Sequence, residues 1–344
     1  MNSLAAKYHG IGDIRLEPME VLPPESGEMI VRVRQAGVCA SDVRAFQVGS
    51  SSLRPPIVLG HEISGEVAAL GRGVTEFQVG DRVCVDPDVY CGKCQQCRTG
   101  SENLCDDRII LGYDLNGGFS EYVRIPRAFL DRRLVYKLPS SMTLEEAALV
   151  EPLSCCFHGL LRSGVCIGRT VVVVGDGPIG LMHLILAKAM GARVGLSGLI
   201  DRNLALAKRL GADFVVNATT SPLEKIRRET NSCGADNVIV AVGLPSVIEH
   251  AIEFSAKRGV VTIFGGCAPN SIISVNPNRI HYEEVTLTGS SGHTNLDYRT
   301  CFQILAGARV KLGEIITHRF SVREITKAFE VDIQQQSIKT LIQP

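Results

Sequence analysis

Four cysteines stand close together in the first third of the sequence. They follow the pattern Cys91-x2-Cys94-x2-Cys97-x7-Cys105, in a loop rich in Gly, Lys and Gln. Four thiolates at this spacing can surround one Zn²⁺ tetrahedrally and fill every coordination position, which leaves none for a substrate. Free thiols gathered this densely would be open to oxidation. The sequence therefore predicts a structural zinc site.

A second set of candidate metal ligands comes from three separate segments. Cys39 is followed by the pair His61-Glu62, and Glu151 comes much later in the chain. One soft ligand, one imidazole and carboxylates suit a zinc ion with an open position for water or substrate. Each residue also has an ordinary interpretation, because a single buried cysteine usually packs and a His-Glu pair often stands in a solvated turn. Spacing alone leaves both interpretations open.

The segment Val171–Gly180 runs from an apolar strand into a helix and contains the pattern G-x-G-x-x-G. In this context the pattern is typical of dinucleotide binding. Its first glycine permits a tight turn, its second lets a pyrophosphate approach the backbone, and its third lets the helix pack closely on the strand. The helix N-terminus would face the phosphates. The predicted cofactor-binding residues here are Gly175, Gly177, Pro178, Ile179 and Gly180.

An acidic residue is expected about 20 residues beyond this motif, at the end of the second strand, where it would hold the adenosine ribose hydroxyls. Gly198 occupies that position, and Asp201 comes slightly later. If the turn is extended, Asp201 reaches the ribose and the cofactor is NAD. If Asp201 points away, Ser197 and Arg202 accept a 2′-phosphate and the cofactor is NADP. We expect NAD, with NADP as the alternative.

Two patterns of secondary structure divide the chain. Residues 1–148 alternate short β-like runs with Gly, Pro and Asp turns, which is typical of an irregular, strand-rich domain. In residues 149–290, helices alternate with solid apolar strands such as Thr170–Val174. Strands buried on both faces with helices between them indicate a parallel doubly wound sheet, and so an α/β protein. We expect residues 291–344 to be a C-terminal segment that returns to the first domain.

Length, charge and cysteine usage limit the possible functions. The 344 residues exceed a single core of about 250–300, so we expect two domains that share a cleft. Thirty-six basic and 36 acidic residues, without long runs of one sign, argue against nucleic acid and acidic membranes as partners. No export signal or membrane-spanning run is visible, and in such a chain twelve cysteines favour metal binding over disulfides. We expect a cytoplasmic protein.

With these motifs in this order, the chain resembles the medium-chain zinc-dependent alcohol dehydrogenases over essentially its whole length. The resemblance rests on Pro56–Val67, Val79–Val83, the four-cysteine lobe, Gly117–Val123 and the glycine motif. The segment Glu151-Pro152-Leu153-Ser154 is most similar to the branch that contains sorbitol, xylitol and threonine dehydrogenases. The resemblance implies a GroES-like catalytic β domain joined to a Rossmann domain.

The resemblance also implies a catalytic metal. A Zn²⁺ ion would be held by Cys39, His61 and Glu62, with Glu151 bound directly or through water, and which glutamate is the third direct ligand stays open. The metal would stabilise the alkoxide of an alcohol, so that a hydride can pass to the nicotinamide. With the structural site, each chain would carry two Zn²⁺ ions.

Further residues are implied near the reacting atoms. Asp42 would orient the imidazole of His61, and Ser41 would begin a proton relay. Sorbitol-type relatives have Phe-Arg-Tyr where this chain has Ser291-Gly292-His293, so an arginine that contacts polyol hydroxyls is missing. His293 is a candidate for contacting substrate hydroxyls, with a surface or interface position as the alternative.

The predicted function is the zinc-dependent interconversion of a secondary alcohol, such as a polyol or cyclitol, and its ketone. The alternative is an L-threonine or other amino-alcohol dehydrogenase. A third hypothesis, a non-catalytic dinucleotide-binding protein on the same fold, predicts loss of the catalytic ligands, all of which are present. We also expect a homodimer or homotetramer formed through the edge strand Val285–Gly289, which would otherwise be left open.

Overall fold

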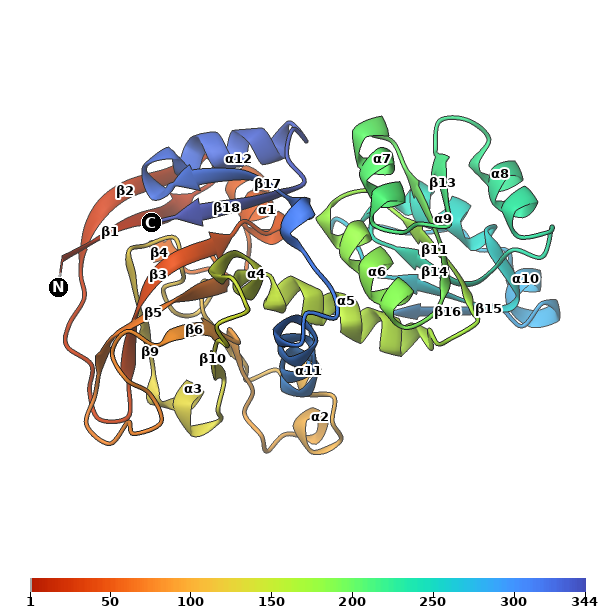
Figure 1. Cartoon of the computed structure of the whole chain (residues 1–344). Helices are drawn as coiled ribbons and strands as arrows, with labels where there is room; N and C mark the ends of the chain where they lie inside the picture. Colours follow the sequence, from red (N-terminus) through yellow and green to blue (C-terminus); the bar gives the residue numbers. More distant parts are fainter. Residues whose placement is uncertain (1) are drawn as a thin grey trace. The chain divides into compact units, whose positions relative to one another are not determined.

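The computed structural model describes residues 2–344, which form two compact units (Figure 1). The first unit comprises residues 2–152 together with Thr294–Pro344, and the second comprises Leu153–His293. The division between them falls inside helix α5 (Val150–Ser163). In the described part of the chain no helix is long and apolar enough to cross a membrane.

The first unit contains the irregular β structure. Its largest sheet has seven strands in the order β10-β6-β5-β3-β18-β17, with β9 also paired to β3, and smaller sheets have the orders β2-β1-β4 and β7-β8. The strands are β1 (Asn2–Gly10), β2 (Asp13–Glu20), β3 (Met29–Gly37), β4 (Ile57–Val58), β5 (Glu62–Leu70), β6 (Arg82–Val85), β7 (Asp88–Val89), β8 (Ile109–Ile110), β9 (Tyr122–Ile125), β10 (Val135–Lys137), β17 (Ile316–Ser321) and β18 (Lys339–Gln343).

Six α-helices lie entirely within the described residues of the first unit. They are α1 (Ala40–Val48), α2 (Gln95–Arg98), α3 (Arg127–Asp131), α4 (Leu144–Ala148), α11 (Asn295–Ala306) and α12 (Ile325–Ile333), with single 3₁₀ turns at Glu102–Leu104, Gly313–Ile315 and Val322–Glu324. The core beneath α12 is aromatic. The ring of Phe329 meets those of Phe46 and Phe119 edge to face, at centroid distances of 5.4 and 6.0 Å. This geometry is favourable for aromatic pairs.

The C-terminal segment completes the large sheet of the first unit. Strand β18 pairs antiparallel with the end of β3, placing Leu341 opposite Gly37 and Ile342 opposite Ala36. The side chains of Leu341 and Ile342 are both fully buried. The last strand therefore adds apolar surface to the core and brings Lys339, its first residue, beside the end of β3.

The second unit is a parallel doubly wound sheet. Its six strands have the order β13-β12-β11-β14-β15-β16, and every neighbouring pair is parallel. The strands are β11 (Thr170–Val174), β12 (Arg193–Gly198), β13 (Phe214–Asn217), β14 (Ala235–Val240), β15 (Ser255–Ile263) and β16 (Thr286–Gly289). The connecting helices are α6 (Pro178–Ala189), α7 (Asp201–Arg209), α8 (Pro222–Glu229), α9 (Pro245–Ile252) and α10 (Pro277–Tyr282). The predicted α/β class is confirmed.

Strand β11 lies inside this sheet, between β12 and β14, and helix α6 follows it; both consist mainly of apolar residues. Val171, Val172 and Val173 are fully buried, as expected for a strand covered on both faces. Helix α6 begins with Pro178 at its first position, where proline lacks only an amide that would be unpaired anyway. The helix is buried almost all round, which is typical of a core helix rather than an amphipathic surface helix.

The close approach of α6 to the turn after β11 requires glycine at residue 180, in the first turn of the helix. A Cβ atom on Gly180 would lie 1.9 Å from the carbonyl oxygen of Gly175. A Cβ atom on Gly177, by contrast, would meet nothing within 4 Å, and the φ of Gly177 is −77°. Two glycines of the same motif therefore differ in the reason for their presence.

We predict that Gly180→Ala destabilises the second unit and that Gly177→Ala does not. The clash at residue 180 must shift backbone, which costs about 1–3 kcal/mol in a packed core. Thermal unfolding followed by circular dichroism measures the difference, with Gly177→Ala as the matched control. Equal midpoints for the two variants would contradict this explanation of Gly180.

Candidate functional site

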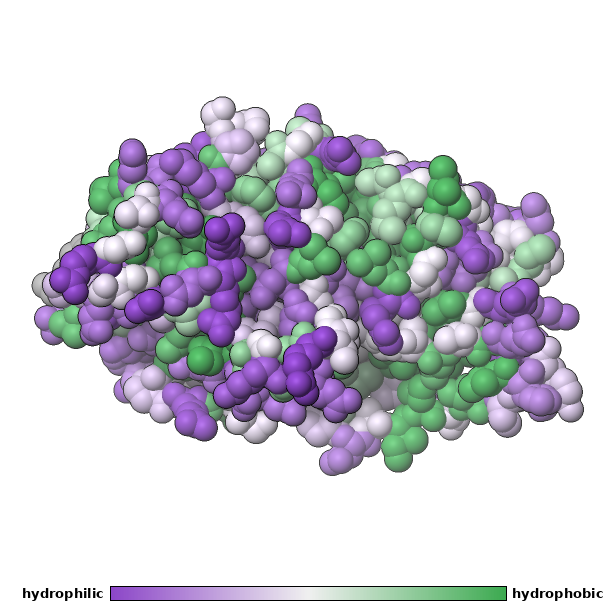
Figure 2. Space-filling view, turned by 90° about the horizontal axis from the view of Figure 1, so that it is seen from below, coloured by the Kyte–Doolittle hydropathy of each residue, from purple (hydrophilic) through white to green (hydrophobic). Residues whose placement is uncertain are grey.

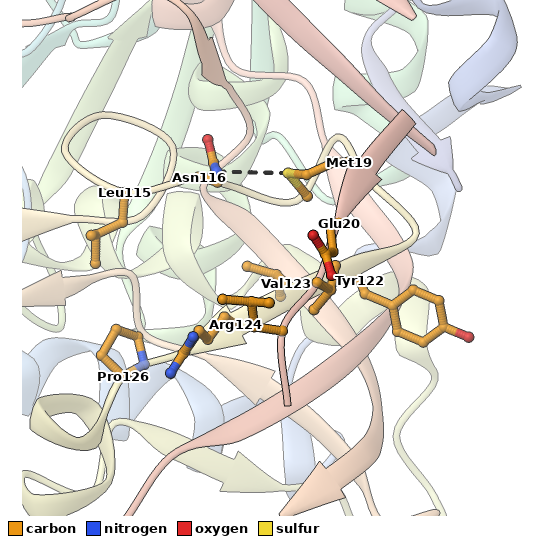
Figure 3. Close-up of a pocket in the computed structure, with 10 residues that line it drawn as sticks. Met19, Glu20, Leu115, Asn116, Tyr122, Val123, Arg124 and Pro126 are labelled. Atoms are coloured by element: carbon orange, nitrogen blue, oxygen red, sulfur yellow. Dashed lines mark hydrogen bonds between the residues drawn. The ribbon is translucent and has the colours of Figure 1, made fainter. Parts of the chain in front are cut away.

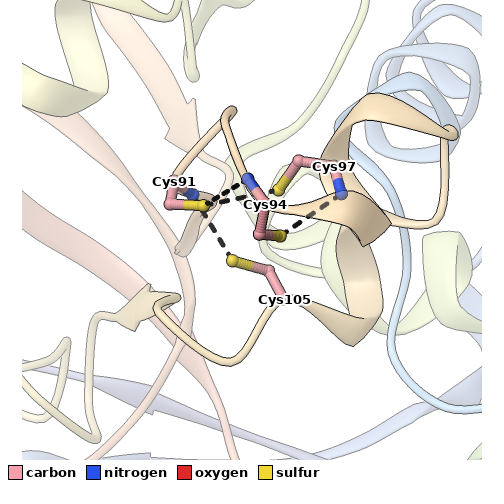
Figure 4. A group of neighbouring side chains, drawn as sticks. All are labelled: Cys91, Cys94, Cys97 and Cys105. Atoms are coloured by element: carbon pink, nitrogen blue, oxygen red, sulfur yellow. Dashed lines mark hydrogen bonds between the residues drawn. The ribbon is translucent and has the colours of Figure 1, made fainter.

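The four cysteines of the loop after β7 converge on one point (Figure 4). Their sulfur atoms all lie within 4.8 Å of one another, and the sulfurs of Cys91 and Cys97 are 3.9 Å apart. Sulfurs at about 2.3 Å from a tetrahedral zinc ion stand about 3.8 Å from each other. A disulfide would need about 2.05 Å, and all four thiols are free. The arrangement of Cys91, Cys94, Cys97 and Cys105 fits a closed zinc site.

Backbone amides stabilise negative charge on these sulfurs. The amide of Cys94 donates to the sulfur of Cys91 at 3.3 Å, and the amide of Cys97 donates to that of Cys94 at 3.4 Å. The amides of Lys93 and Cys94 lower the pKa of Cys91 to about 6. Burial acts in the opposite direction on Cys97 and raises its pKa to about 12. The cluster thus contains one thiol that is readily deprotonated, and the thiolate is the form that binds metal.

The dispersed residues Cys39, His61 and Glu62 also come together, all within the first unit. One ligand atom from each lies within 4.8 Å of the others. Cys39 follows β3 and begins helix α1, and its amide donates to the carboxylate of Asp42 at 3.0 Å, as in a helix capping interaction. His61 immediately precedes β5, and Glu62 is its first residue. The pairing of β3 with β5 therefore brings the three residues together.

The burial of this group indicates that it is built for a cation. His61 and Asp42 are buried, and Glu62 is fully buried. Three polar atoms have no hydrogen-bond partner among the described residues, namely Asp42 Oδ1, His61 Nδ1 and Glu62 Oε2. A buried acceptor without a partner costs free energy, so such a concentration requires a ligand. Cys39 is only partly buried, which leaves one side open. The donor set suits zinc with an exchangeable position.

The electrostatics of His61 agree with this interpretation. Burial opposes the protonated form of the imidazole, but the carboxylate of Asp42 and the thiol of Cys39 outweigh it and raise the pKa of His61 well above its ordinary value. His61 Nδ1 and Asp42 Oδ1 are 3.8 Å apart. Burial raises the pKa of Asp42 above its usual range. The group stabilises positive charge at the position of the imidazole.

Lys339 is a residue of this site that the sequence analysis missed. Its ammonium group donates to Glu62 Oε1 at 2.6 Å and to the carbonyl of Val38 at 2.8 Å. Both Lys339 and Glu62 are almost completely excluded from solvent. The ion pair with Oε1 leaves Oε2 as the oxygen of Glu62 that has no hydrogen-bond partner among the described residues. No local motif marks Lys339, because it lies 277 residues away in the sequence.

Glu62 also depends on a glycine opposite it. A Cβ atom on Gly37 would lie 1.9 Å from Glu62 Oε2. The φ of Gly37 is not in the left-handed region, so space, rather than backbone conformation, requires glycine here. Any larger residue would displace the carboxylate from the group.

Tyr113 is a second residue that the sequence analysis missed. Its ring lies 5.6 Å from that of His61, and its hydroxyl is within hydrogen-bonding reach of Ser41 on α1. Burial raises the pKa of Tyr113 to about 12, so its hydroxyl stays protonated at neutral pH. The predicted relay residue Ser41 therefore has a hydroxyl partner beside the candidate metal ligands.

The two remaining predicted residues lie in different units. Glu151 stands in the first turn of α5, in the first unit, and is buried. Its carboxylate acts on His61 and contributes to the raised pKa of the imidazole. His293 belongs to the second unit, where it is fully buried with Nδ1 3.6 Å from the sulfur of Cys155. His293 is thus not a surface residue of this structure.

The predicted dinucleotide residues of the second unit gather at the carboxyl ends of β11 and β12. The amide of Gly175 donates to the carbonyl of Ser197 at 2.8 Å, which ties the glycine loop to the end of β12. Gly198 ends that strand. Asp201 and Arg202 are exposed in the first turn of α7, and Asp201 Oδ1 accepts a hydrogen bond from Asn217 at 3.0 Å. Gly177, Pro178, Ile179 and Gly180 form the start of α6.

A separate hollow in the first unit is lined by residues at the end of β2, in the loop after β8 and in β9, including Met19, Leu115, Asn116 and Arg124 (Figure 3). Its lining contains no cysteine or histidine. The guanidinium of Arg124 is held by Glu28, at a position that is partly exposed. This hollow therefore has none of the chemistry of the buried group.

Comparisons with known proteins agree with the fold and the motifs. Residues 25–139 match the alcohol dehydrogenase GroES-like domain, and residues 178–307 match the zinc-binding dehydrogenase family. Sorbitol dehydrogenase of Bacillus subtilis is 32% identical, over 100% of this chain and 98% of its own. L-threonine 3-dehydrogenase of Caldanaerobacter subterraneus is also 32% identical, over 100% and 99%.

A solved structure extends the likeness to three dimensions. A putative zinc-binding dehydrogenase from Sinorhizobium meliloti, bound to NADP, matches with a TM-score of 0.92 and 27% identity, over 100% of both chains. The sequence relatives exceed 30% identity along their full length, so the predicted family is confirmed. The chain belongs to the medium-chain zinc-dependent alcohol dehydrogenases, in the branch of the sorbitol and threonine dehydrogenases, and it is an oxidoreductase.

Proposed function

We propose that this enzyme transfers a hydride between a secondary alcohol of the polyol or cyclitol class and NAD, at a zinc ion held by Cys39, His61 and Glu62. The observation that carries the proposal is the buried group itself, in which one ligand atom each of Cys39, His61 and Glu62 lies within 4.8 Å of the others. Glu62 Oε2 is buried there without a hydrogen-bond partner among the described residues. When bound there, zinc supplies the Lewis acidity that makes an alcohol easier to deprotonate.

The protein side chains then have distinct tasks. Asp42 holds the imidazole of His61 in place, which is the usual role of a carboxylate beside a ligating histidine. Lys339 neutralises Glu62 through the hydrogen bond that it donates to Oε1. The hydroxyl of Ser41, beside that of Tyr113, would take the proton of the alcohol while it passes its own proton on to water, and Tyr113 remains protonated at its raised pKa. Glu62 is favoured over Glu151 as the third direct ligand by its grouping with Cys39 and His61.

The relatives indicate two substrate classes, polyols and amino alcohols. A sorbitol dehydrogenase and an L-threonine 3-dehydrogenase share the same identity with this chain. Initial rates with NAD and NADP against polyols, cyclitols, simple secondary alcohols and threonine, with zinc removed and restored, test the proposal. Zinc-dependent turnover of a polyol or cyclitol supports it, and turnover of threonine alone would replace it with the amino-alcohol alternative.

We predict that each chain binds two zinc ions and that a substitution in one site removes only the ion of that site. Cys39→Ser should reduce zinc from two to one per chain and lower kcat by more than roughly 100-fold, because even the partners of metal ligands cost 10–100-fold. Cys97→Ser should remove the other ion and lower the thermal midpoint. Elemental analysis, turnover and thermal unfolding measure the three effects. Full turnover with a single zinc confined to the four-cysteine lobe would disprove the proposed mechanism.

We predict that Lys339→Met is strongly destabilising. Removing one partner of a buried ion pair leaves an uncompensated charge and costs about 3–5 kcal/mol. Lys339→Arg should restore much of the loss, because it keeps the positive charge. The control is Lys327→Met, whose side chain is exposed. The free energy of unfolding in urea and the zinc content of each variant are the measurements, and a Met variant as stable as the unmodified enzyme would contradict the role of Lys339.

We further propose that the enzyme forms a homodimer or homotetramer. Strand β16 lies at the edge of the second unit's sheet, where no second strand of the described residues pairs with it. Nearby Ile280 and Tyr282 on α10 are exposed, and Figure 2 shows hydrophobic side chains gathered on one face of this unit.

All twelve cysteines are free, which agrees with a reducing, cytoplasmic location.

Sedimentation velocity tests the assembly. We expect a mass of two or four times 37.1 kDa at micromolar concentration. Charged substitutions at Ile280 and Tyr282 should shift the distribution towards single chains, whereas Leu22→Asp, on the first unit, should not. A monomer at every concentration would contradict the proposed assembly.

A further inference from the structure

The glycine loop of the second unit carries an acidic residue whose position is unusual. Asp176 lies between Gly175 and Gly177, and its side chain reaches across to the end of β12. Asp176 Oδ2 accepts hydrogen bonds from the amides of Leu199 and Ile200, at 2.9 and 2.7 Å. The carboxylate therefore stands where the chain leaves the second strand of the sheet, although it comes from the first turn.

The glycine at the end of β12 is complementary to this carboxylate. A Cβ atom on Gly198 would lie 2.4 Å from both Cβ and Cγ of Asp176 and 2.5 Å from Oδ2. No side chain at residue 198 can coexist with Asp176 in this position. The space into which residue 198 would project its acid is filled by the carboxylate of Asp176. The acidic group expected at this strand end has thus changed its position in the sequence but is present in space.

Asp176 is also held rigidly and remains accessible. Its carbonyl accepts a hydrogen bond from the side chain of Asn203 at 3.1 Å, and Asn203 is buried. Asp176 itself is only partly buried. Both amides bind Oδ2, which leaves Oδ1 with free lone pairs in the described part of the chain. A rigid, partly exposed carboxylate beside a phosphate-binding turn is suited to paired hydroxyl groups.

Asp201, the other acidic candidate for the ribose hydroxyls, has a different hydrogen-bond partner. Asp201 Oδ1 accepts from the side chain of Asn217 at the end of β13, and Asp201 is exposed on α7. Ser197 is buried within β12. Neither residue competes with Asp176 for the position beside Gly175.

We propose that Asp176 is the residue that binds the adenosine ribose hydroxyls and makes this enzyme selective for NAD over NADP. The inference rests on the proposed dinucleotide function of the second unit. A carboxylate accepts hydrogen bonds from the 2′- and 3′-hydroxyls of NAD, whereas the 2′-phosphate of NADP would bring negative charge against it. The residue that selects NAD over NADP therefore belongs to the glycine loop and not to the end of the second strand.

Isothermal titration of the zinc-loaded enzyme with NADH and NADPH, without substrate, tests this inference. We expect NADH to bind at least about 10-fold more tightly, because a hydrogen bond to a charged group contributes roughly 10- to 100-fold in affinity. Asp176→Ala should bring the two dissociation constants within about 3-fold of each other, mainly by weakening NADH. Asp201→Ala is the matched control, and it should leave the ratio of the two constants unchanged.

A compensating pair of substitutions separates recognition from folding. Gly198→Asp alone should clash with Asp176 and lower the thermal midpoint. The double variant Asp176→Ala/Gly198→Asp should recover both the midpoint and the preference for NADH, because the acid then returns to the strand end. Equal or tighter binding of NADPH by the unmodified enzyme, or an unchanged ratio in Asp176→Ala, would overturn the inference. Failure to bind either dinucleotide would instead refute the proposed function.

Discussion

The buried carboxylate of Glu62 constrains much of the first unit. Its charge is completely removed from solvent, and an ion in that position is tolerated only when its oxygens have partners. Lys339 satisfies Oε1 from the last strand of the chain, and Oε2 has no hydrogen-bond partner among the described residues. The C-terminal strand must therefore return to β3, and the apolar residues Leu341 and Ile342 that follow Lys339 hold it there. The same segment thus completes the core and compensates the charge of the candidate site.

Both candidate sites use a glycine to admit a carboxylate. Gly37 leaves room for Glu62 Oε2, and Gly198 leaves room for the side chain of Asp176. In each pair the glycine and the acid come from different strands or turns, so the absence of a Cβ atom on one segment determines where a charge on another can lie. Packing in protein interiors is dense enough that one methyl group decides the question. This explains why Gly198 looks like a missing acid in the sequence and like a filled position in the structure.

Much of the fold could be predicted from the sequence because its signals are local. The solid apolar run Thr170–Val174 and the glycine motif predict a buried strand followed by a helix, which are β11 and α6. The four cysteines stand within one loop, so their spacing alone predicts a cluster, and the structure brings their sulfurs together. The pairing of strands in the first unit cannot be predicted from local patterns, because β3 pairs with β5, β9 and β18 from distant parts of the chain.

The sequence by itself determined the family, the two kinds of domain, the clustering of the four cysteines and the types of ligand that a catalytic metal needs. These follow from residue types and short spacings, which can be recognised without knowledge of the tertiary contacts. Only the tertiary structure placed Lys339 against Glu62, Tyr113 against Ser41, and Asp176 in the space beside Gly198. Such contacts depend on which strands pair and on where single side chains find room, and no local pattern in the chain encodes either.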